Sequence, residues 1–578
     1  MNEVTKNNLE RDFILRDSEF TSFFDSLDKE NMRFVRKKVS HYPRKVQGII
    51  IGLYCKEKTP FDANTALRKL TDNLDSIIPP ALLNHFDAGE HELREIADKM
   101  AEHCRNYEIR ENRVYSSAIV NAKSSKKNFL SGSESNSITG SNPVNDSRSN
   151  IKVEGVYLWC INFVNGKGLR APEVSTKQTI EGCIKRMQDR GWWLRRLRRL
   201  ITKSREEVMI QLEQVSRTKG IYCSDLTVMN RQYQKQQQLE MLKTLVMTNE
   251  QGEQFSLYDA YEANVSNPTL RRNELMTRMR GFEDMAKEFG NIGIFVTLTC
   301  PSRYHNAYSK SGQRNPKWQG LTPYEGQQYL CNTWAKMRAE FARQDIRTYG
   351  LRIAEPQHDG TPHWHMMLFV EQEQAEQFKS IIEHYSFVED GNEKGARENR
   401  VKFVDIDPKK GSATGYIAKY VCKNIDGANL DKGVHGEDPI MAAQRVEAWA
   451  SCWGIRQFQQ IGGVSVTVWR ELRRLRDSSV FKDEALTELH KAADDGNWAS
   501  YTKLMGGVFC MRKLQAIRPY YEMEVNKITG LIKTSWFDGL ITQKLKGILH
   551  KGNEIITRIH TWQLGKAGTD FVPSLGVL

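Results

Sequence analysis

The chain has 578 residues, enough for several domains with at least one well-buried core. Hydrophobic residues make up 39% and charged residues 27% of the sequence, which is typical of a globular protein in water. The sequence holds no uncharged apolar run long enough to cross a bilayer, so it predicts no membrane association. Lysine and arginine exceed aspartate and glutamate by 13, a balance that fits either a basic soluble protein or one that binds a polyanion such as nucleic acid.

Two further features concern the cellular compartment. The ten cysteines form no CxxC pair, so neither a disulfide framework nor a zinc ribbon is expected. The opening residues, MNEVTKNNLERDF, lack the apolar core and basic leader of a signal peptide. Together these features predict a cytoplasmic protein.

Composition and periodicity divide the chain into five regions. Residues 1–120 have apolar residues at helical spacing and predict a helical N-terminal domain. Residues 121–150 are rich in serine and asparagine and predict a flexible linker. Three regions follow: a helical basic region at 151–288, a mixed region at 289–430, and a mainly helical C-terminal domain at 431–578.

The helical basic region contains the segment WWLRRLRRL at residues 192–200. Its leucines recur every third residue with arginines between them, which predicts an amphipathic basic helix. Such a helix either packs through its leucines with a solvated basic face, or lies along a DNA backbone. The adjacent aromatic pair favours DNA, and the candidate DNA-binding residues are Trp192, Arg195, Arg196, Arg198 and Arg199.

The mixed region predicts an α+β fold. Strands are expected at residues 294–299, 349–354, 361–370 and 400–406, and helices at 323–344, 371–385 and 413–425. The order β-α-β-β-α-β-α begins as a ferredoxin-like, split βαβ arrangement, in which the first and third strands lie side by side in an antiparallel sheet. Many unrelated functions use this fold, so the fold alone does not identify one.

The third expected strand contains His363-Trp364-His365. Side chains alternate along a strand, so both imidazoles lie on one face and Trp364 lies on the other, where it can be buried. Two such histidines can chelate one divalent ion and leave positions open for a substrate oxygen. Thirteen histidines in this length give about 0.3 such pairs by chance, so the pair alone does not establish a metal site.

A third ligand is expected from the neighbouring hairpin strand, where Glu355 and His358 are the candidates. A hairpin loop with an odd number of residues centred on Asp359 places Glu355 opposite His363, on the metal face. A two-residue Asp359-Gly360 loop would instead pair Glu355 with Trp364 and turn it away. We predict the odd loop and therefore Glu355.

The last expected helix of the region places Tyr416, Tyr420, Lys419 and Lys423 on one face at 100° per residue, and its apolar residues on the other. Phenols and ammonium groups are therefore expected to face outward together. A phenol has a pKa near 10, and nearby positive charge would ease its ionisation. Tyr304 and Tyr308 have the same spacing, but no lysine pair shares their face, so they are expected at most to contact substrate.

Three motifs in this order, IFVTLTCP, TPHWHMMLF and YIAKYVCKN, resemble the HUH endonuclease superfamily and its rolling-circle initiators with two tyrosines. The longer run GLRIAEPQHDGTPHWHMMLF, with the downstream RVEAWASCWGIRQFQQIGG, is similar to the bacteriophage replication gene A protein family. The similarity is strong over residues 260–475.

This resemblance implies a function. His363, His365 and Glu355 would bind Mg²⁺ or Mn²⁺, and Tyr416 and Tyr420 would cut single-stranded origin DNA in turn through a 5′-phosphotyrosyl link that is later rejoined. Thr297 and Thr299 match the first motif and would support the site. The sequence contains no GxxxxGK[ST] loop, so no nucleotide cofactor is expected and a replicative helicase of the bacterial host is implied as a partner.

Other functions remain as alternatives. A single-strand transposase or a plasmid relaxase would use the same chemistry, although relaxases usually carry the nucleophile before the histidines. A non-catalytic DNA-binding replication factor would keep the fold without the reaction. A metalloprotease is disfavoured because the sequence has no HExxH motif.

Overall fold

The computed structural model describes residues 17–78, 85–129, 143–176, 178–428, 431, 436–475, 483–526 and 529–566. The chain divides into two compact units. The first comprises Met1–Leu212 with Val525–Thr542, and the second comprises Glu213–Glu524 with Gln543–Leu578. Among the described residues, no helix is both long and apolar enough to cross a membrane.

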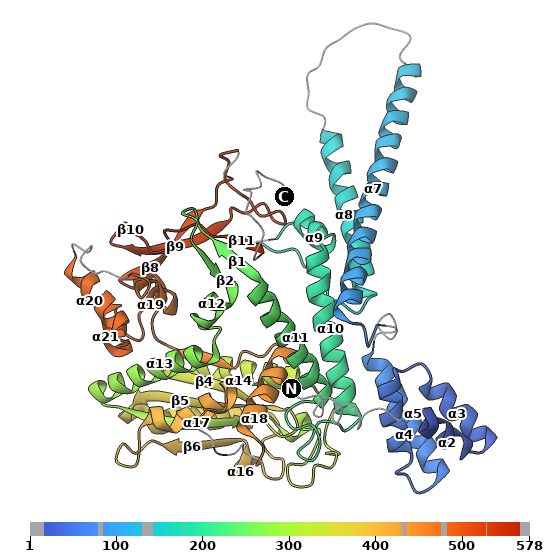
Figure 1. The fold of residues 1–578 in the computed structure, drawn as a ribbon, viewed down its shortest axis with the longest axis horizontal. Helices are drawn as coiled ribbons and strands as arrows, with labels where there is room; N and C mark the ends of the chain where they lie inside the picture. The colour runs from blue at the N-terminus through green and yellow to red at the C-terminus, as the bar shows by residue number, and fades with distance from the viewer. Residues whose placement is uncertain are drawn as a thin grey trace. The chain divides into compact units, whose positions relative to one another are not determined.

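The first unit is built mainly of helices (Figure 1). In chain order they are α2 (Asp17–Asp25), α3 (Lys29–Val39), α4 (Arg44–Tyr54), α5 (Pro60–Ile77), α7 (Glu90–Phe129), α8 (Pro143–Asn165), α9 (Ile180–Met187) and α10 (Arg190–Gln211). The long helices α7, α8 and α10 pack around a core that includes Cys104, Cys160, Trp193 and Leu197.

These helices confirm the helical prediction for the described part of residues 1–120. The predicted linker at 121–150 is partly wrong, because α7 continues to Phe129 and α8 begins at Pro143; residues 130–142 lie outside the described residues. The prediction followed the Ser- and Asn-rich composition, because a segment with few apolar residues gives only a weak helical periodicity.

The second unit contains a five-stranded antiparallel sheet in the order β6-β3-β5-β4-β7. Three of its strands, β4, β5 and β6, are labelled in Figure 1. The strands are β3 (Asn291–Thr299), β4 (Tyr349–Pro356), β5 (Pro362–Glu371), β6 (Val401–Asp405) and β7 (Phe458–Ile461). The first four confirm the ferredoxin-like order, with β3 and β5 side by side at the centre. The edge strand β7 was not predicted.

Helices cover both faces of this sheet. α14 (Pro323–Arg343) and α15 (Ala375–Phe387) cover one face, and α13 (Pro268–Phe289) and α17 (Ala413–Ile425) cover the other. α14 begins with a capping box between Thr322 and Glu325, which fixes where the chain turns into the helix. Every residue of β4 is buried as a consequence of this double covering.

The remaining elements of the second unit show where the predicted domains were wrong. Residues 151–288 are not one helical region, because the boundary between the two units follows Leu212. This region also contains two strands, β1 (Leu245–Thr248) and β2 (Gln254–Ser256), which lie in the sequence between the helices α11 (Asp225–Thr244) and α12 (Leu257–Glu262). The C-terminal region is not mainly helical. After α18 (Pro439–Trp453), α19 (Val466–Leu472), α20 (Glu484–Asp494) and α21 (Trp498–Leu504) come four strands: β8 (Ile517–Met523), β9 (Gln543–His550), β10 (Asn553–Ile556) and β11 (Gln563–Lys566).

Trp364 confirms the alternation predicted for β5. It is fully buried on the α14 side, where its indole N–H donates to Gln327 over 3.0 Å and the Arg352 guanidinium lies 4.2 Å from its ring centroid. His363 and His365 lie on the opposite face of the strand.

We expect Trp364→Ala to lower the free energy of unfolding by about 3–5 kcal/mol, because it leaves a large cavity and an unpaired Gln327. Urea unfolding followed by circular dichroism would measure the loss. The control Trp318→Ala removes a partly exposed indole, and an equal loss from both variants would contradict the assignment of Trp364 to the core.

Candidate active site

Three possible metal ligands converge near the end of the central hairpin. One ligand atom from each of Glu355, His363 and His365 lies within 4.8 Å of the others. The Nε2 atoms of the two imidazoles are 2.9 Å apart, and Nε2 of His365 lies 3.9 Å from a Glu355 oxygen. Two imidazole nitrogens and one carboxylate oxygen form a donor set that suits a divalent cation and leaves positions open.

The hairpin register explains why Glu355 joins the histidines. Glu355 pairs with His363 and Pro356 with Pro362, so residues 357–361 form the odd loop that the sequence predicted. Within the loop, Gln357 N–H donates to Thr361 O and Gly360 N–H donates to Gln357 O. The alternative ligand His358 is buried in this loop, where its carbonyl accepts from the Tyr222 N–H, outside the convergent group.

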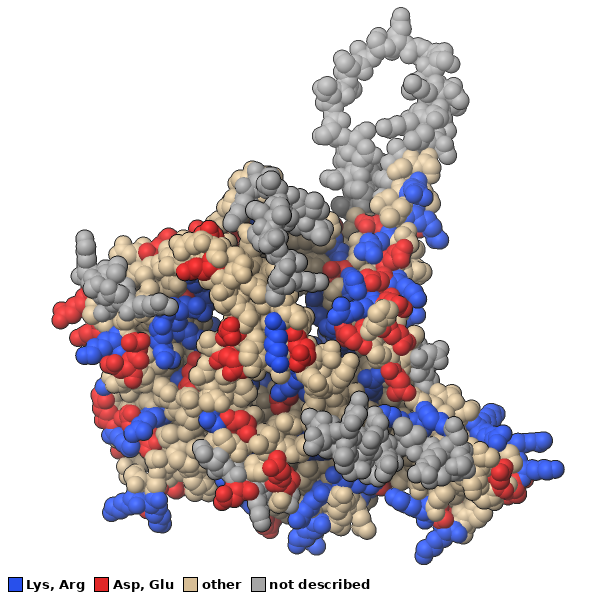
Figure 2. All heavy atoms as spheres, viewed as in Figure 1, with Lys and Arg blue, Asp and Glu red and all other residues tan. Residues whose placement is uncertain are grey.

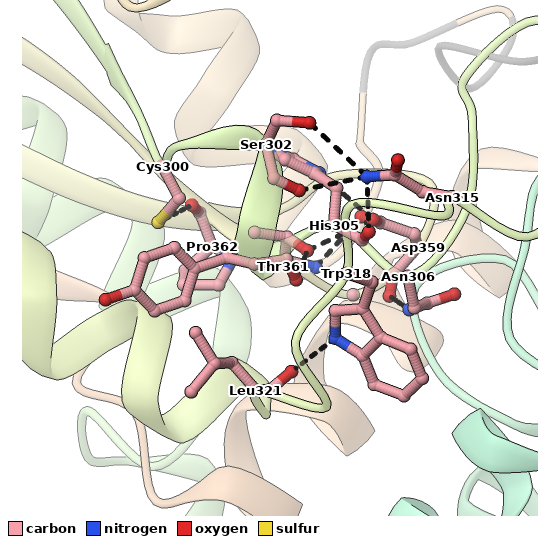
Figure 3. A network of polar contacts seen from close by, with 12 residues as sticks. Cys300, Ser302, His305, Asn306, Asn315, Trp318, Leu321, Asp359, Thr361 and Pro362 are labelled. Carbon is pink, nitrogen blue, oxygen red and sulfur yellow. Dashed lines mark hydrogen bonds and ion pairs between the residues drawn. The ribbon is translucent and has the colours of Figure 1, made fainter. Parts of the chain in front are cut away.

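A network of polar contacts joins this loop to the segment that follows β3 (Figure 3). Asp359 is fully buried and lies 3.0 Å from Nδ1 of His305, while its carboxylate accepts from the Thr361 N–H. Asn306, next to His305, donates to the Asp359 carbonyl over 2.7 Å. Burial alone would raise the pKa of Asp359 and lower that of His305, but their attraction reverses both and holds the pKa of Asp359 at about 2.

His305 was not predicted to have a role in the site. The signal was its position in SRYH directly after the first strand, but only the fold shows that this segment meets the hairpin loop.

The protonation states of Glu355, His363 and His365 favour the binding of a cation. Burial would raise the pKa of Glu355, but the positive charge and hydrogen bond of Lys423 hold it at about 2. Burial lowers the pKa of His365 to about 4, and burial together with His365 lowers that of His363 well below its ordinary value. The group therefore holds an ionised carboxylate and neutral imidazoles, the forms that bind metal ions.

Two structural observations bear on whether a divalent cation fits among Glu355, His363 and His365. Thr297 Oγ1 lies 3.1 Å from Nδ1 of His365; with the proton on that nitrogen, the Nε2 lone pair is left for a cation. The buried Nδ1 of His363 and Oδ1 of Asn424 find no hydrogen-bond partner among the described residues. The residues present therefore fit a divalent ion.

Thr297 and Thr299 lie where the first motif predicted. In the β3–β5 register Thr297 pairs with His365 and Thr299 with His363. The Thr297 side chain bonds to His365, and a supporting role for the two threonines stays a prediction.

The helix α17 begins and ends at the predicted residues and places both tyrosines beside the ligand group. The Tyr420 ring centroid lies 4.2 Å from that of His365, and Tyr416, one turn earlier, lies 6.3 Å from Tyr420. Phe295 on β3 packs against both phenol rings. Tyr416 is 39% exposed, whereas burial and the neighbouring Tyr416 raise the pKa of Tyr420 to about 12.

Lys423 corrects the prediction for this helix. Lys419 is exposed as expected, but Lys423 is only 8% exposed, and its Nζ donates to Glu355 over 2.8 Å. Asn424 donates to the other oxygen of the same carboxylate. Lys423 does share a helical face with the tyrosines, but the C-terminal turn of that face docks on β4 and β5 and is closed to solvent. Lys423 is thus buried as the ion-pair partner of Glu355 and does not face solvent.

Tyr304 and Tyr308 are placed differently. Tyr304 lies in a short 3-10 turn, with its ring 5.3 Å from that of Tyr329, and Tyr308 is 46% exposed. A role for either in contacting substrate stays a prediction.

The predicted DNA-binding residues of α10 fall into separate groups. Trp192 is 5% exposed and packs edge-on against Trp193 in the helical core, at the wall of a cavity. Arg198 is ion-paired with Glu90 of α7. Arg195, Arg196 and Arg199 line a cavity of the first unit.

The family model for the bacteriophage replication gene A protein (GPA) matches residues 122–428. The chain is 41% identical over 399 residues to the replication gene A protein of Escherichia phage 186, an alignment covering 67% of this chain and 56% of the relative. It is 36% identical over 436 residues to the replication protein of Haemophilus phage HP1, covering 72% and 54%.

A third relative, the probable replication endonuclease from a prophage-like region of Salmonella paratyphi A, is 34% identical over 362 residues, covering 60% of this chain and 45% of its own length. The chain thus spans about half the length of the curated relatives it matches. No solved structure matches it. The family model covers more than half of the chain, including the convergent histidines and both tyrosines, and the chain therefore belongs to the bacteriophage replication gene A protein family.

Proposed function

We propose that this protein initiates rolling-circle replication of phage DNA as a metal-dependent, strand-specific endonuclease and strand transferase of the HUH type. The observation that carries the proposal is the placement of Tyr420 and Tyr416 on one helix beside the convergent Glu355, His363 and His365. Relatives named as replication gene A protein and probable replication endonuclease support the same function.

The reaction is a transesterification. A tyrosine phenol loses its proton, its oxygen attacks the phosphorus of one phosphodiester, and the bond to the 3′-oxygen breaks. The 3′-oxygen leaves with a proton as a free hydroxyl, and the 5′-phosphate stays on the tyrosine. Rejoining is the reverse attack of a 3′-hydroxyl on that link, so the phosphodiester is conserved and ATP is not needed.

The chain's residues have separate tasks in this reaction. Glu355, His363 and His365 would hold Mg²⁺ or Mn²⁺, which supplies positive charge to the phosphate oxygens and positions the scissile bond. The exposed Lys419, one turn from Tyr416, adds positive charge that would stabilise the phosphate in the transition state. Thr297 orients His365, and Lys423 with Asn424 orients Glu355. With a second tyrosine on the same helix, one cut can follow another without release of the first link.

The proposed partners follow from this reaction. The substrate is single-stranded origin DNA in the cytoplasm of a bacterial host. The sequence has no phosphate-binding loop of its own, so strand separation would fall to a host replicative helicase.

We expect an incubation with Mn²⁺ and labelled single-stranded oligonucleotides, tiled across the DNA around the gene, to give a covalent protein–DNA adduct. Denaturing gels would detect the adduct in the wild type and not in the Tyr416→Phe/Tyr420→Phe double variant or in the presence of a chelator. The two single variants would show which phenol cuts first.

Tyr304→Phe/Tyr308→Phe serves as the matched control, since it removes two phenols of the same spacing away from α17. Wild-type protein that binds the oligonucleotides without any adduct would instead favour the non-catalytic replication factor. Adducts at transposon ends, or at a plasmid transfer origin, would favour a transposase or a relaxase.

We expect Thr297→Val to weaken Mn²⁺ binding roughly 10–100-fold, because the partner of His365 is lost while the shape of the side chain is kept. Isothermal titration calorimetry would measure the affinity. Thr299→Val is the matched control on the same strand, and an equal effect of both substitutions would show that the hydrogen bond has no special role.

We expect Lys423→Met to lower the free energy of unfolding by about 3–5 kcal/mol, because it leaves the Glu355 carboxylate buried without its counter-charge. Urea unfolding would measure the loss. The double variant Lys423→Met/Glu355→Gln removes both charges and should lose much less. If the two substitutions were simply additive, the ion pair would not be the source of the effect.

A further inference from the structure

A cavity of about 560 Å³ lies in the first unit, at the N-terminal half of α10. Arginines dominate its wall. They come from the segment before α9, from α9 itself and from α10: Arg170, Arg186, Arg195, Arg196 and Arg199, with Trp192 between them. Its volume lies in the range of sites that hold a ligand about the size of a nucleotide.

The positive charge of this wall is incompletely balanced. Arg186 is paired with Asp538 over 3.0 Å, Arg170 is paired over 2.5 Å with Glu173, which also lines the cavity, and Arg195 is 4.0 Å from Asp189. Among the described residues, no carboxylate comes within ion-pair distance of Arg196 or Arg199. Burial, followed by the charges of Arg199, Arg195 and Arg170, lowers the pKa of Arg196. The guanidinium groups therefore repel one another, and a bound anion would relieve that repulsion.

The rest of α10 shows that this arrangement is local. On its α7 side, Arg190 and Arg198 are matched by Asp98 and Glu90. On the face drawn in Figure 2, basic and acidic side chains alternate along the long helices of the unit. An arginine-rich wall with few carboxylates is thus a property of the cavity and not of the whole helix.

Packing gives only part of the reason for these arginines. Arg196 lies over the Trp192 ring at 5.5 Å, a cation–π contact that accounts for Arg196 but not for its neighbours. Arg195 and Arg199 are exposed, and so bury little surface. A concave wall of guanidinium groups is suited to phosphate oxygens, because each guanidinium group can donate two hydrogen bonds to one phosphate.

We infer that this cavity binds the phosphodiester backbone of single-stranded DNA, and that it forms a second DNA contact distinct from the ligand group of the second unit. A flexible single strand can bend its phosphates into a cavity of this size, whereas a duplex is too wide to enter it. The inference deepens the proposed function and rests on it for the identity of the polyanion. A free nucleotide would present the same phosphate chemistry, and the test separates the two sources.

The test uses the full chain and a fluorescein-labelled single-stranded 20-mer (an arbitrary probe length) over a series of salt concentrations. The cavity variant is Arg195→Gln/Arg196→Gln/Arg199→Gln. The matched control is Arg94→Gln/Arg105→Gln/Arg110→Gln, which removes the same charge from exposed positions of α7. Fluorescence anisotropy gives the dissociation constant and its dependence on salt.

We expect the cavity variant to bind at least roughly tenfold more weakly at low salt, with the slope of log K against log salt reduced by about 2. The control variant should change much less. The melting temperature of the cavity variant should be unchanged or raised, because repulsion among the arginines is removed; a purely structural cluster would lower it. Equal weakening in both variants, or none in either, would overturn the inference.

Competition separates the two phosphate sources. If ATP binds the wild type at micromolar concentration without displacing the probe, and the cavity variant loses ATP binding but keeps its DNA affinity, the cavity is a nucleotide site and the inference is wrong. Failure of the proposed function looks different, since it would appear as wild-type protein that forms no covalent adduct. Failure of the cavity alone would leave that adduct in place.

Discussion

The pairing of Glu355 with His363 is the constraint on which the rest of the site depends. Side chains alternate along a strand, so a hairpin loop longer or shorter by one residue would move the carboxylate to the face of Trp364 and leave two imidazoles without an anionic partner. This register is stabilised because Asp359, at the centre of the loop, is buried and hydrogen-bonded to the segment that follows β3. The polar network around Asp359 thus helps to hold the hairpin register that brings the three ligands together.

The two faces of the sheet divide packing from chemistry. On the α14 side, β5 contributes Trp364 and aliphatic residues to a closed core. On the α13 and α17 side the same strand is apolar toward one end, at Met367 and Phe369, and carries the histidines toward the hairpin. The apolar end holds α17 in place, and the polar end is where the helix presents its tyrosines. Rigid packing within a few residues of the donor set is what keeps that set in position.

The sequence predicted the elements whose signals are local. Strand alternation predicted the shared face of His363 and His365, the limits of α17 followed from its helical periodicity, and loop parity selected Glu355. Properties that depend on distant segments were missed. Periodicity placed Lys423 on the tyrosine face but could not show that this face docks on β4 at its last turn. The short strand β7 and the strands after Ile517 lack a long alternating pattern, and their pairing depends on partners elsewhere in the chain.

The helix α17 joins the proposed nucleophiles to the proposed metal ligands as one rigid piece. Lys423 and Asn424 bind the Glu355 carboxylate at the C-terminal end of the helix, and Tyr420 and Tyr416 lie about one and two turns earlier. The distance from each phenol to the donor set is therefore fixed by helix geometry and not by a loop. The same contact keeps the buried carboxylate ionised and oriented without help from a bound cation, because a lysine supplies the counter-charge. A cation entering such a site would meet ligands that are already aligned, with both tyrosines already beside them.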